Sequence, residues 1–171
     1  MGTTETLEAP EMTIEVTKEH HWLQKFVGEW TFEGEATMGP DGPPMTWAGT
    51  ASVRPIGDVW VLAEWQGEVP GGGVGTSITT LGYDPQKKRF VQTFIGSMMT
   101  SLWVSEGTLD ADERVLTLDG EGPDMMDESK TATYRDVIEF ETDDHRILTS
   151  YVLGDDGKWN HFMTAHYRRR V

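Results

Sequence analysis

Hydrophobic and polar residues alternate along the segment from Glu29 to Met38. One set of positions holds Trp30, Phe32, Gly34, Ala36 and Met38, and the other holds Glu29, Thr31, Glu33, Glu35 and Thr37. Because successive side chains of a strand point to opposite faces, this pattern predicts a β-strand. Its first set should face a core and its second set should face solvent.

The same kind of segment recurs along the rest of the chain. Turn-forming residues return every 8 to 15 residues, as in Asp84-Pro85-Gln86-Lys87 and Asp155-Asp156-Gly157, and the intervening stretches are rich in Val, Thr, Ile and aromatics. About nine breaks imply about ten strands joined by short loops. A meander of this length exposes two long edges unless it closes on itself, so the pattern favours an all-β, single up-and-down antiparallel β-barrel over a sandwich.

A short N-terminal helix is predicted from Thr17 to Val27. Thr17 is a suitable N-cap, Glu19 lies in the first turn, and apolar residues then follow at helical spacing until Gly28. Residues 1–16 are expected to form a flexible tail, and residues 17–171 a single barrel domain.

Composition narrows the range of partners. The chain of 171 residues carries 14 Lys+Arg against 29 Asp+Glu, a net charge of −15 that disfavours nucleic acid and anionic membrane surfaces. It has no Cys, which excludes thiol catalysis and disulfides. Its first residues lack a signal-like apolar stretch, and no segment has the length of a membrane span, so we expect a cytoplasmic protein.

The final strand has two faces that composition does not distinguish. One holds Trp159, His161, Met163, Ala165 and Tyr167, and the other holds Asn160, Phe162, Thr164, His166 and Arg168. We predict that the face with Met163 is interior, although residue types alone do not determine which face of the last three strands points into the barrel.

The segment Phe26-Val27-Gly28-Glu29-Trp30 resembles the G-x-W signature that begins the first strand of calycin (lipocalin-like) barrels. That resemblance implies that Trp30 plugs the closed end of the barrel and that an arginine near the C-terminus packs across it. Arg168 or Arg169 could be this arginine, and Arg169 falls on the same alternation as Met163, on the face that we predict to be interior. Such a pair gains cation–π attraction.

A closer resemblance covers roughly residues 20 to 170. Its landmarks are Phe26-Val27-Gly28-Glu29-Trp30, Leu81-Gly82-Tyr83-Asp84, Ser97-Met98-Met99-Thr100, Tyr134-Arg135-Asp136 and Ala165-His166-Tyr167-Arg168-Arg169. They resemble a bacterial domain-of-unknown-function family, the one numbered fifteen seventy-nine. The resemblance supports the fold and implies no catalytic residue.

Two charged residues interrupt apolar segments. Glu64 lies within Val59-Trp60-Val61-Leu62-Ala63-Glu64-Trp65, and Arg135 precedes Val137 and Ile138. A lone buried charge is costly, so an inward Arg135 would be suited to a carboxylate of a ligand. The alternative is that one or both point to solvent or form a structural ion pair.

Aromatic and methionine side chains provide candidates for an adaptable apolar pocket, although core packing explains many of them equally well. The predicted ligand-binding set is Glu64, Met98, Thr100, Trp103, Tyr134, Arg135, His161, Met163 and Tyr167. Met125 and Met126 lie in the longest predicted loop, which is expected to fold over the barrel mouth as a lid.

His161 and His166 should face opposite sides of the last strand, so at most one enters the barrel. An inward histidine could act as a general base, or bind haem iron as in the nitrobindin-like relatives of calycins. No cofactor is predicted, and haem is the lesser alternative. The acidic clusters lack the spacing of a calcium loop, so no metal site is predicted.

These observations support three hypotheses. The leading one is a cytoplasmic barrel that binds a small, mainly apolar ligand with an acidic group facing Arg135. The second is a cofactor-independent acid–base enzyme of the isomerase or cyclase type, which would need an inward residue such as Glu64 or His161. The third is a self-associating scaffold, for example a homodimer, with a filled barrel.

Overall fold

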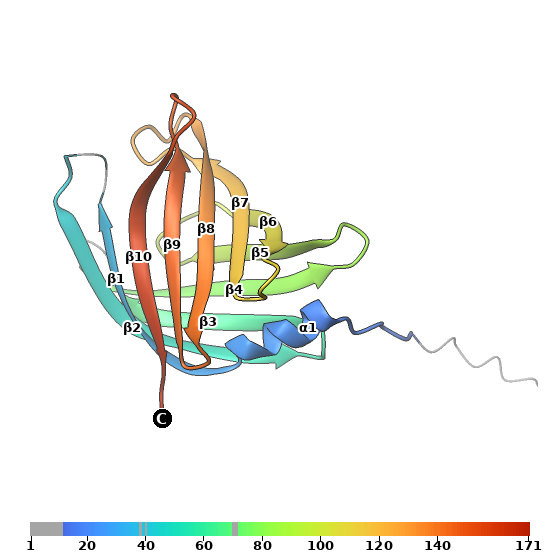
Figure 1. The fold of residues 1–171 in the computed structure, drawn as a ribbon. Helices are drawn as coiled ribbons and strands as arrows, with labels where there is room; N and C mark the ends of the chain where they lie inside the picture. The colour runs from blue at the N-terminus through green and yellow to red at the C-terminus, as the bar shows by residue number, and fades with distance from the viewer. Residues whose placement is uncertain (1–11, 38, 40, 70–71) are drawn as a thin grey trace, which may run out of the picture.

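The computed structural model describes residues 12–37, 39, 41–69 and 72–171, and these form one closed antiparallel barrel (Figure 1). The ten strands are β1 (Gly28–Thr37), β2 (Pro44–Ile56), β3 (Trp60–Glu68), β4 (Val74–Asp84), β5 (Arg89–Gly96), β6 (Trp103–Leu109), β7 (Val115–Pro123), β8 (Thr131–Thr142), β9 (His145–Leu153) and β10 (Trp159–Arg169). Each pairs with its neighbour in sequence, and β1 pairs with β10. The predicted ten-stranded barrel is confirmed. Most of the expected tail, residues 1–11, lies outside the described residues.

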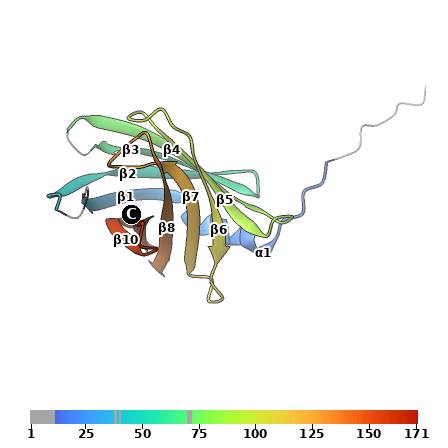
Figure 2. The same ribbon diagram turned by 90° about the horizontal axis from the view of Figure 1, so that it is seen from above.

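The barrel has two different ends. Strands β8 to β10 rise steeply while β3 to β5 cross them, and Figure 2 shows the same strands from above. The turns after even-numbered strands lie at the end that the helix covers, which we call the helix end. The loops after odd-numbered strands, including 97–102 and 124–130, lie at the opposite end, which we call the loop end.

The alternation predicted in β1 is present in the structure. Trp30, Phe32 and Gly34 are buried, whereas Glu33 and Glu35 are exposed. Met38, which the pattern also assigned to the interior, lies outside the described residues. One face of β1 therefore contributes to the core, as expected for a strand with one buried face.

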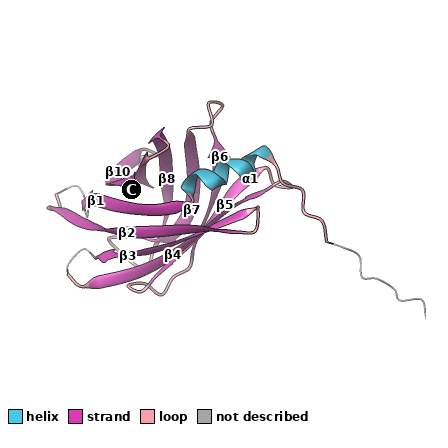
Figure 3. Ribbon diagram, turned by 90° about the horizontal axis from the view of Figure 1, so that it is seen from below, coloured by secondary structure: helices cyan, strands magenta, loops and turns pink. Residues whose placement is uncertain are grey.

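A short helix, α1 (Lys18–Leu23), crosses the helix end and continues as a 3₁₀ turn over Gln24–Phe26 (Figure 3). The Thr17 hydroxyl accepts a hydrogen bond from the His20 amide, and the His20 ring accepts one from the Thr17 amide. The side chains of Trp22 and Phe26 are buried inside the barrel at the helix end. Among the described residues, no helix is long and apolar enough to cross a bilayer.

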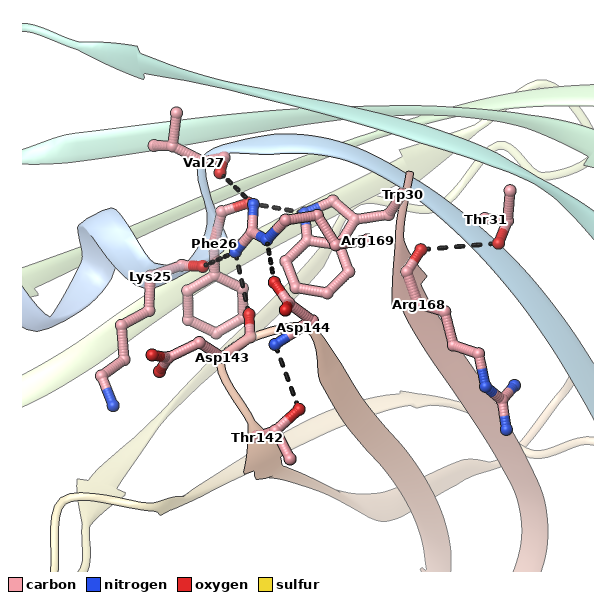
Figure 4. A network of polar contacts seen from close by, with 10 residues as sticks. All are labelled: Lys25, Phe26, Val27, Trp30, Thr31, Thr142, Asp143, Asp144, Arg168 and Arg169. Atoms are coloured by element: carbon pink, nitrogen blue, oxygen red, sulfur yellow. Dashed lines mark hydrogen bonds and ion pairs between the residues drawn. The ribbon is translucent and has the colours of Figure 1, made fainter. Parts of the chain in front are cut away.

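Trp30 and Arg169 close this end of the barrel (Figure 4). Trp30 has no exposed surface, and its indole nitrogen donates to the Phe26 carbonyl at 2.8 Å. The Arg169 guanidinium lies 4.2 Å from the centre of the indole ring. It also donates to the carbonyls of Lys25, Val27 and Asp143 and to the Asp144 carboxylate. One side chain thus joins the helix, the start of β1 and the β8–β9 turn.

Gly28 is required beside this arginine. Its φ of +133° is in the region that favours glycine, and a Cβ there would lie 2.5 Å from Arg169 Nη1. The glycine of the signature therefore leaves space for the guanidinium as well as ending the helical segment.

Replacing Arg169 by Met should lower the free energy of unfolding by about 2–4 kcal/mol, because two partly buried carbonyls and a third carbonyl lose a charged donor and Trp30 loses its cation–π partner. Urea denaturation measures the change. Arg168→Met is the matched control, since Arg168 is the exposed neighbour on the same strand and should change stability by less than about 0.5 kcal/mol. Equal effects of the two substitutions would contradict this role for Arg169.

Candidate functional site

A cavity of about 500 Å³ lies inside the barrel. It extends from Phe26 at the helix end to Met98 and Met125 in the loops of the opposite end. Its apolar lining includes Phe32, Trp47, Val61, Trp65, Phe94, Leu118, Ile138 and Leu148. Since Met98 lines the cavity and is also 50% exposed, the cavity reaches the surface at the loop end.

An aromatic cluster forms part of the cavity wall at the loop end. Trp103 and Phe162 both pack edge-to-face against Tyr134, with ring centres 5.1 and 6.0 Å apart. The Tyr134 hydroxyl donates to the Pro123 carbonyl at 2.6 Å, which ties the start of the 124–130 loop to the barrel wall. Met125 of this loop lines the cavity, whereas Met126 is 73% exposed.

A β-bulge in β10 changes which of its side chains face inward. The pairing of β10 with β9 shifts between His161 and Met163. As a result, Phe162 and Met163 both line the cavity, followed by Ala165 and Tyr167 at the regular alternation. The expected interior position of Met163 agrees with this arrangement, but His161 above the bulge does not share its face.

Five of the nine predicted ligand-binding residues line the cavity: Met98, Trp103, Tyr134, Met163 and Tyr167. Thr100 is exposed in the 97–102 loop and is not part of the lining. The cavity therefore brings together residues from one loop and three strands that the sequence suggested only individually.

The structure places the charged residues of the predicted set outside the cavity, which corrects their expected inward orientation. Glu64 is exposed because it alternates with Ala63 and Trp65, which line the interior. His161 lies outside because of the bulge, with Nε2 2.6 Å from the Thr164 hydroxyl.

Arg135 also faces outward. It donates through Nε and Nη2 to Asp119 at 2.7 and 2.8 Å and lies 4.2 Å from the Trp159 ring centre. This is the structural ion pair that the sequence left as an alternative. An acidic ligand group inside the barrel therefore does not face Arg135.

The polar residue that does face the cavity from β8 is Asp136. Its carboxylate accepts a hydrogen bond of 2.5 Å from the Ser150 hydroxyl of β9. Gln92 and Ser105 extend this polar row, with Gln92 Nε2 3.4 Å from the Ser105 hydroxyl, and all four residues line the cavity. Burial raises the pKa of Asp136, and hydrogen bonds from Ser150 and Gln92 oppose that rise.

Arg146 of β9 is the second charged residue that lines the cavity. It is 4% exposed, and its guanidinium lies 4.2 Å from the ring centre of Tyr167, 4.4 Å from that of Trp30 and 5.1 Å from that of Phe26. Burial lowers the pKa of Arg146 to about 10, so it remains charged at neutral pH. Burial raises the pKa of the Tyr167 hydroxyl, which stays protonated.

The five histidines all belong to the described residues, and none of them lines the cavity. His166 is on the outer face, where its Nδ1 lies 3.0 Å from His145 Nε2. A haem inside the barrel would therefore lack the axial histidine considered from the sequence. Within the described ranges, no three His, Cys, Asp or Glu side chains are arranged to hold a metal ion.

Comparison with protein-family models matches residues 15–169 to DUF1579, a family described as protein of unknown function. The chain belongs to the DUF1579 family. A search of curated proteins finds no match.

Two solved structures of other proteins have a fold similar to that of this DUF1579 protein. Rv2717c from M. tuberculosis is 11% identical, with a TM-score of 0.61, over 92% of this chain and 100% of that one. The S-type phycobiliprotein lyase CPES from Guillardia theta is 15% identical, with a TM-score of 0.59, over 88% of this chain and 92% of that one. At these identities the similarity concerns the barrel alone.

The raised pKa of Asp136 predicts a pH-dependent difference in stability between this DUF1579 protein and its Asp136→Asn variant. The folded state binds the proton more tightly than the unfolded state does. Relative to the variant, the wild type should therefore lose stability as pH rises from about 4 through the folded-state pKa, by up to about 1.4 kcal/mol per pH unit.

Urea denaturation at a series of pH values measures this difference. Asp155→Asn is the control, since it makes the same substitution at an exposed loop position away from the cavity. A pH-independent difference for Asp136→Asn would mean that this carboxyl titrates normally in the folded protein.

Proposed function

We propose that this DUF1579 protein binds a small, mainly apolar molecule inside the barrel. The observation that carries the proposal is the cavity of about 500 Å³, which the protein's own aromatic side chains do not fill. Small-molecule sites commonly enclose about 300–1,000 Å³ and combine an apolar lining with a few polar groups. The row around Asp136 and the guanidinium of Arg146 are such groups.

The loop end supports a route for the ligand. Met98, Leu102 and Met126 are 50%, 62% and 73% exposed, and Met125 continues the same surface into the cavity. Methionine adapts its shape to different apolar partners. We therefore assign the 97–102 and 124–130 loops to ligand entry, with Met125 and Met126 as the parts of a lid.

An acid–base enzyme remains a second candidate because of one observation. Asp136 faces the cavity with a raised pKa and a hydroxyl partner, which is what proton transfer within an apolar site requires. Glu64 and His161, the residues first considered for this role, point away from the cavity. If a ligand is turned over, Asp136→Asn should abolish turnover while ligand affinity changes little.

A scaffold with a filled barrel is not supported, because the described side chains leave the interior open. Binding and proton transfer both use this interior, so a direct ligand measurement is the first test.

Nile red, a neutral dye that fluoresces in apolar surroundings, should bind the purified protein and be displaced by apolar competitors. Ser77→Phe should weaken this binding by about tenfold or more, because Ser77 lines the cavity and the larger ring would occupy it.

Thr76→Phe is the matched control, since Thr76 is the neighbouring residue of β4 and is not part of the lining. It should leave dye binding unchanged. Equal binding by both variants, or no binding by the wild type, would contradict the proposed function.

A further inference from the structure

Arg146 differs from the other arginines that pack on aromatic rings. Arg135 is paired with Asp119, and Arg169 with Asp144. Across the residues that the structure describes, no ion pair involves Arg146. Its Nη1 is the one buried side-chain nitrogen or oxygen of that part of the chain without a hydrogen-bond partner.

The surroundings of Arg146 leave its charge uncompensated. Besides burial, Tyr167 and the like-charged Arg169 act on the pKa of Arg146, whereas the Asp136 carboxylate acts on the pKa of the neighbouring Tyr167. The three rings stabilise the cation partly through cation–π attraction. A buried charge without a counterion still costs several kcal/mol, and an anion of the right geometry would offset this cost.

Tyr167 supplies a second donor next to this arginine. It is the direct cross-strand partner of Arg146 in the β9–β10 ladder, and both line the cavity. Its hydroxyl is protonated at neutral pH and can donate. A guanidinium and a hydroxyl together match the acceptor pattern of a carboxylate.

The remaining charges limit the anion to a single negative charge. Asp136 faces the cavity from β8, four residues before Phe140, which is the cross-strand partner of Arg146. At the rise of a strand, the backbone positions of Asp136 and Phe140 are about 13 Å apart. A second acidic group in the middle of the ligand would approach Asp136 and its polar row. A dianion at Arg146 itself would exceed the one positive charge available.

Resting on the proposed function, we infer that the ligand is an apolar monocarboxylic acid whose carboxylate binds Arg146 at the helix end. The apolar body then runs along Leu148 and Ile138 toward the methionines of the loop end. The acidic group first expected opposite Arg135 is in this way assigned to a residue that the sequence did not single out.

The test compares straight-chain acids with alcohols of the same length, such as decanoate and decanol, by displacement of Nile red at neutral pH. The wild type should bind the acid about tenfold or more tightly than the alcohol, as expected for a charge-assisted hydrogen bond. Arg146→Met should remove this preference and retain the affinity for the alcohol. Tyr167→Phe should reduce the preference by a smaller factor.

Arg135→Met is the control because it removes an arginine from the outer face, and it should keep the preference for the acid. Far-UV circular dichroism checks that each variant folds, and the comparison of acid with alcohol on the wild type needs no variant. Equal affinity of the wild type for acid and alcohol, or a preference that persists in Arg146→Met, would overturn the inference and leave apolar binding intact. Failure of the wild type to bind Nile red, acid or alcohol would instead overturn the proposed function.

Discussion

The contact between Trp30 and Arg169 is the interaction on which the rest of this barrel depends. It joins the first strand to the last, the pairing with the largest sequence separation and therefore the largest loop-closure entropy. Arg169 offsets that cost by donating to the carbonyls of Lys25 and Val27, which follow the helix, and to that of Asp143 in the β8–β9 turn. Closure here also makes the interior a cavity with one open end.

The elements of the fold could be predicted from sequence because each depends on neighbouring residues. The alternation of β1, the turn residues between strands and the N-cap at Thr17 act over a few positions only. The bulge in β10 could not be predicted in this way. Phe162 and Met163 are both apolar, so no change of residue type marks the position where the inner face shifts by one residue.

The candidate site was harder to predict, since the direction of a charged side chain depends on long-range pairing. Asp136 alternates on the same strand face as Tyr134, Ile138 and Phe140, so the sequence does indicate that it points inward. The positive charge of Arg135 ahead of an apolar segment was the more conspicuous feature and was chosen instead. Strand β9 gives no contrast between its faces, because Arg146, Leu148 and Ser150 alternate with Ile147, Thr149 and Tyr151. Only the register with β8 and β10 shows which set is internal.

The bulge at Phe162 separates β10 into two parts with different constraints. Below it, Ala165 and Tyr167 keep the register with β1 that the closed end requires. Above it, Trp159 to His161 pair with β9, and within the described residues they do not pair with β1. Substitutions in this upper part can reshape the mouth of the barrel without disturbing the pairing of β10 with β1. The bulge therefore allows the mouth of the barrel to vary while the seam between β1 and β10 keeps its register.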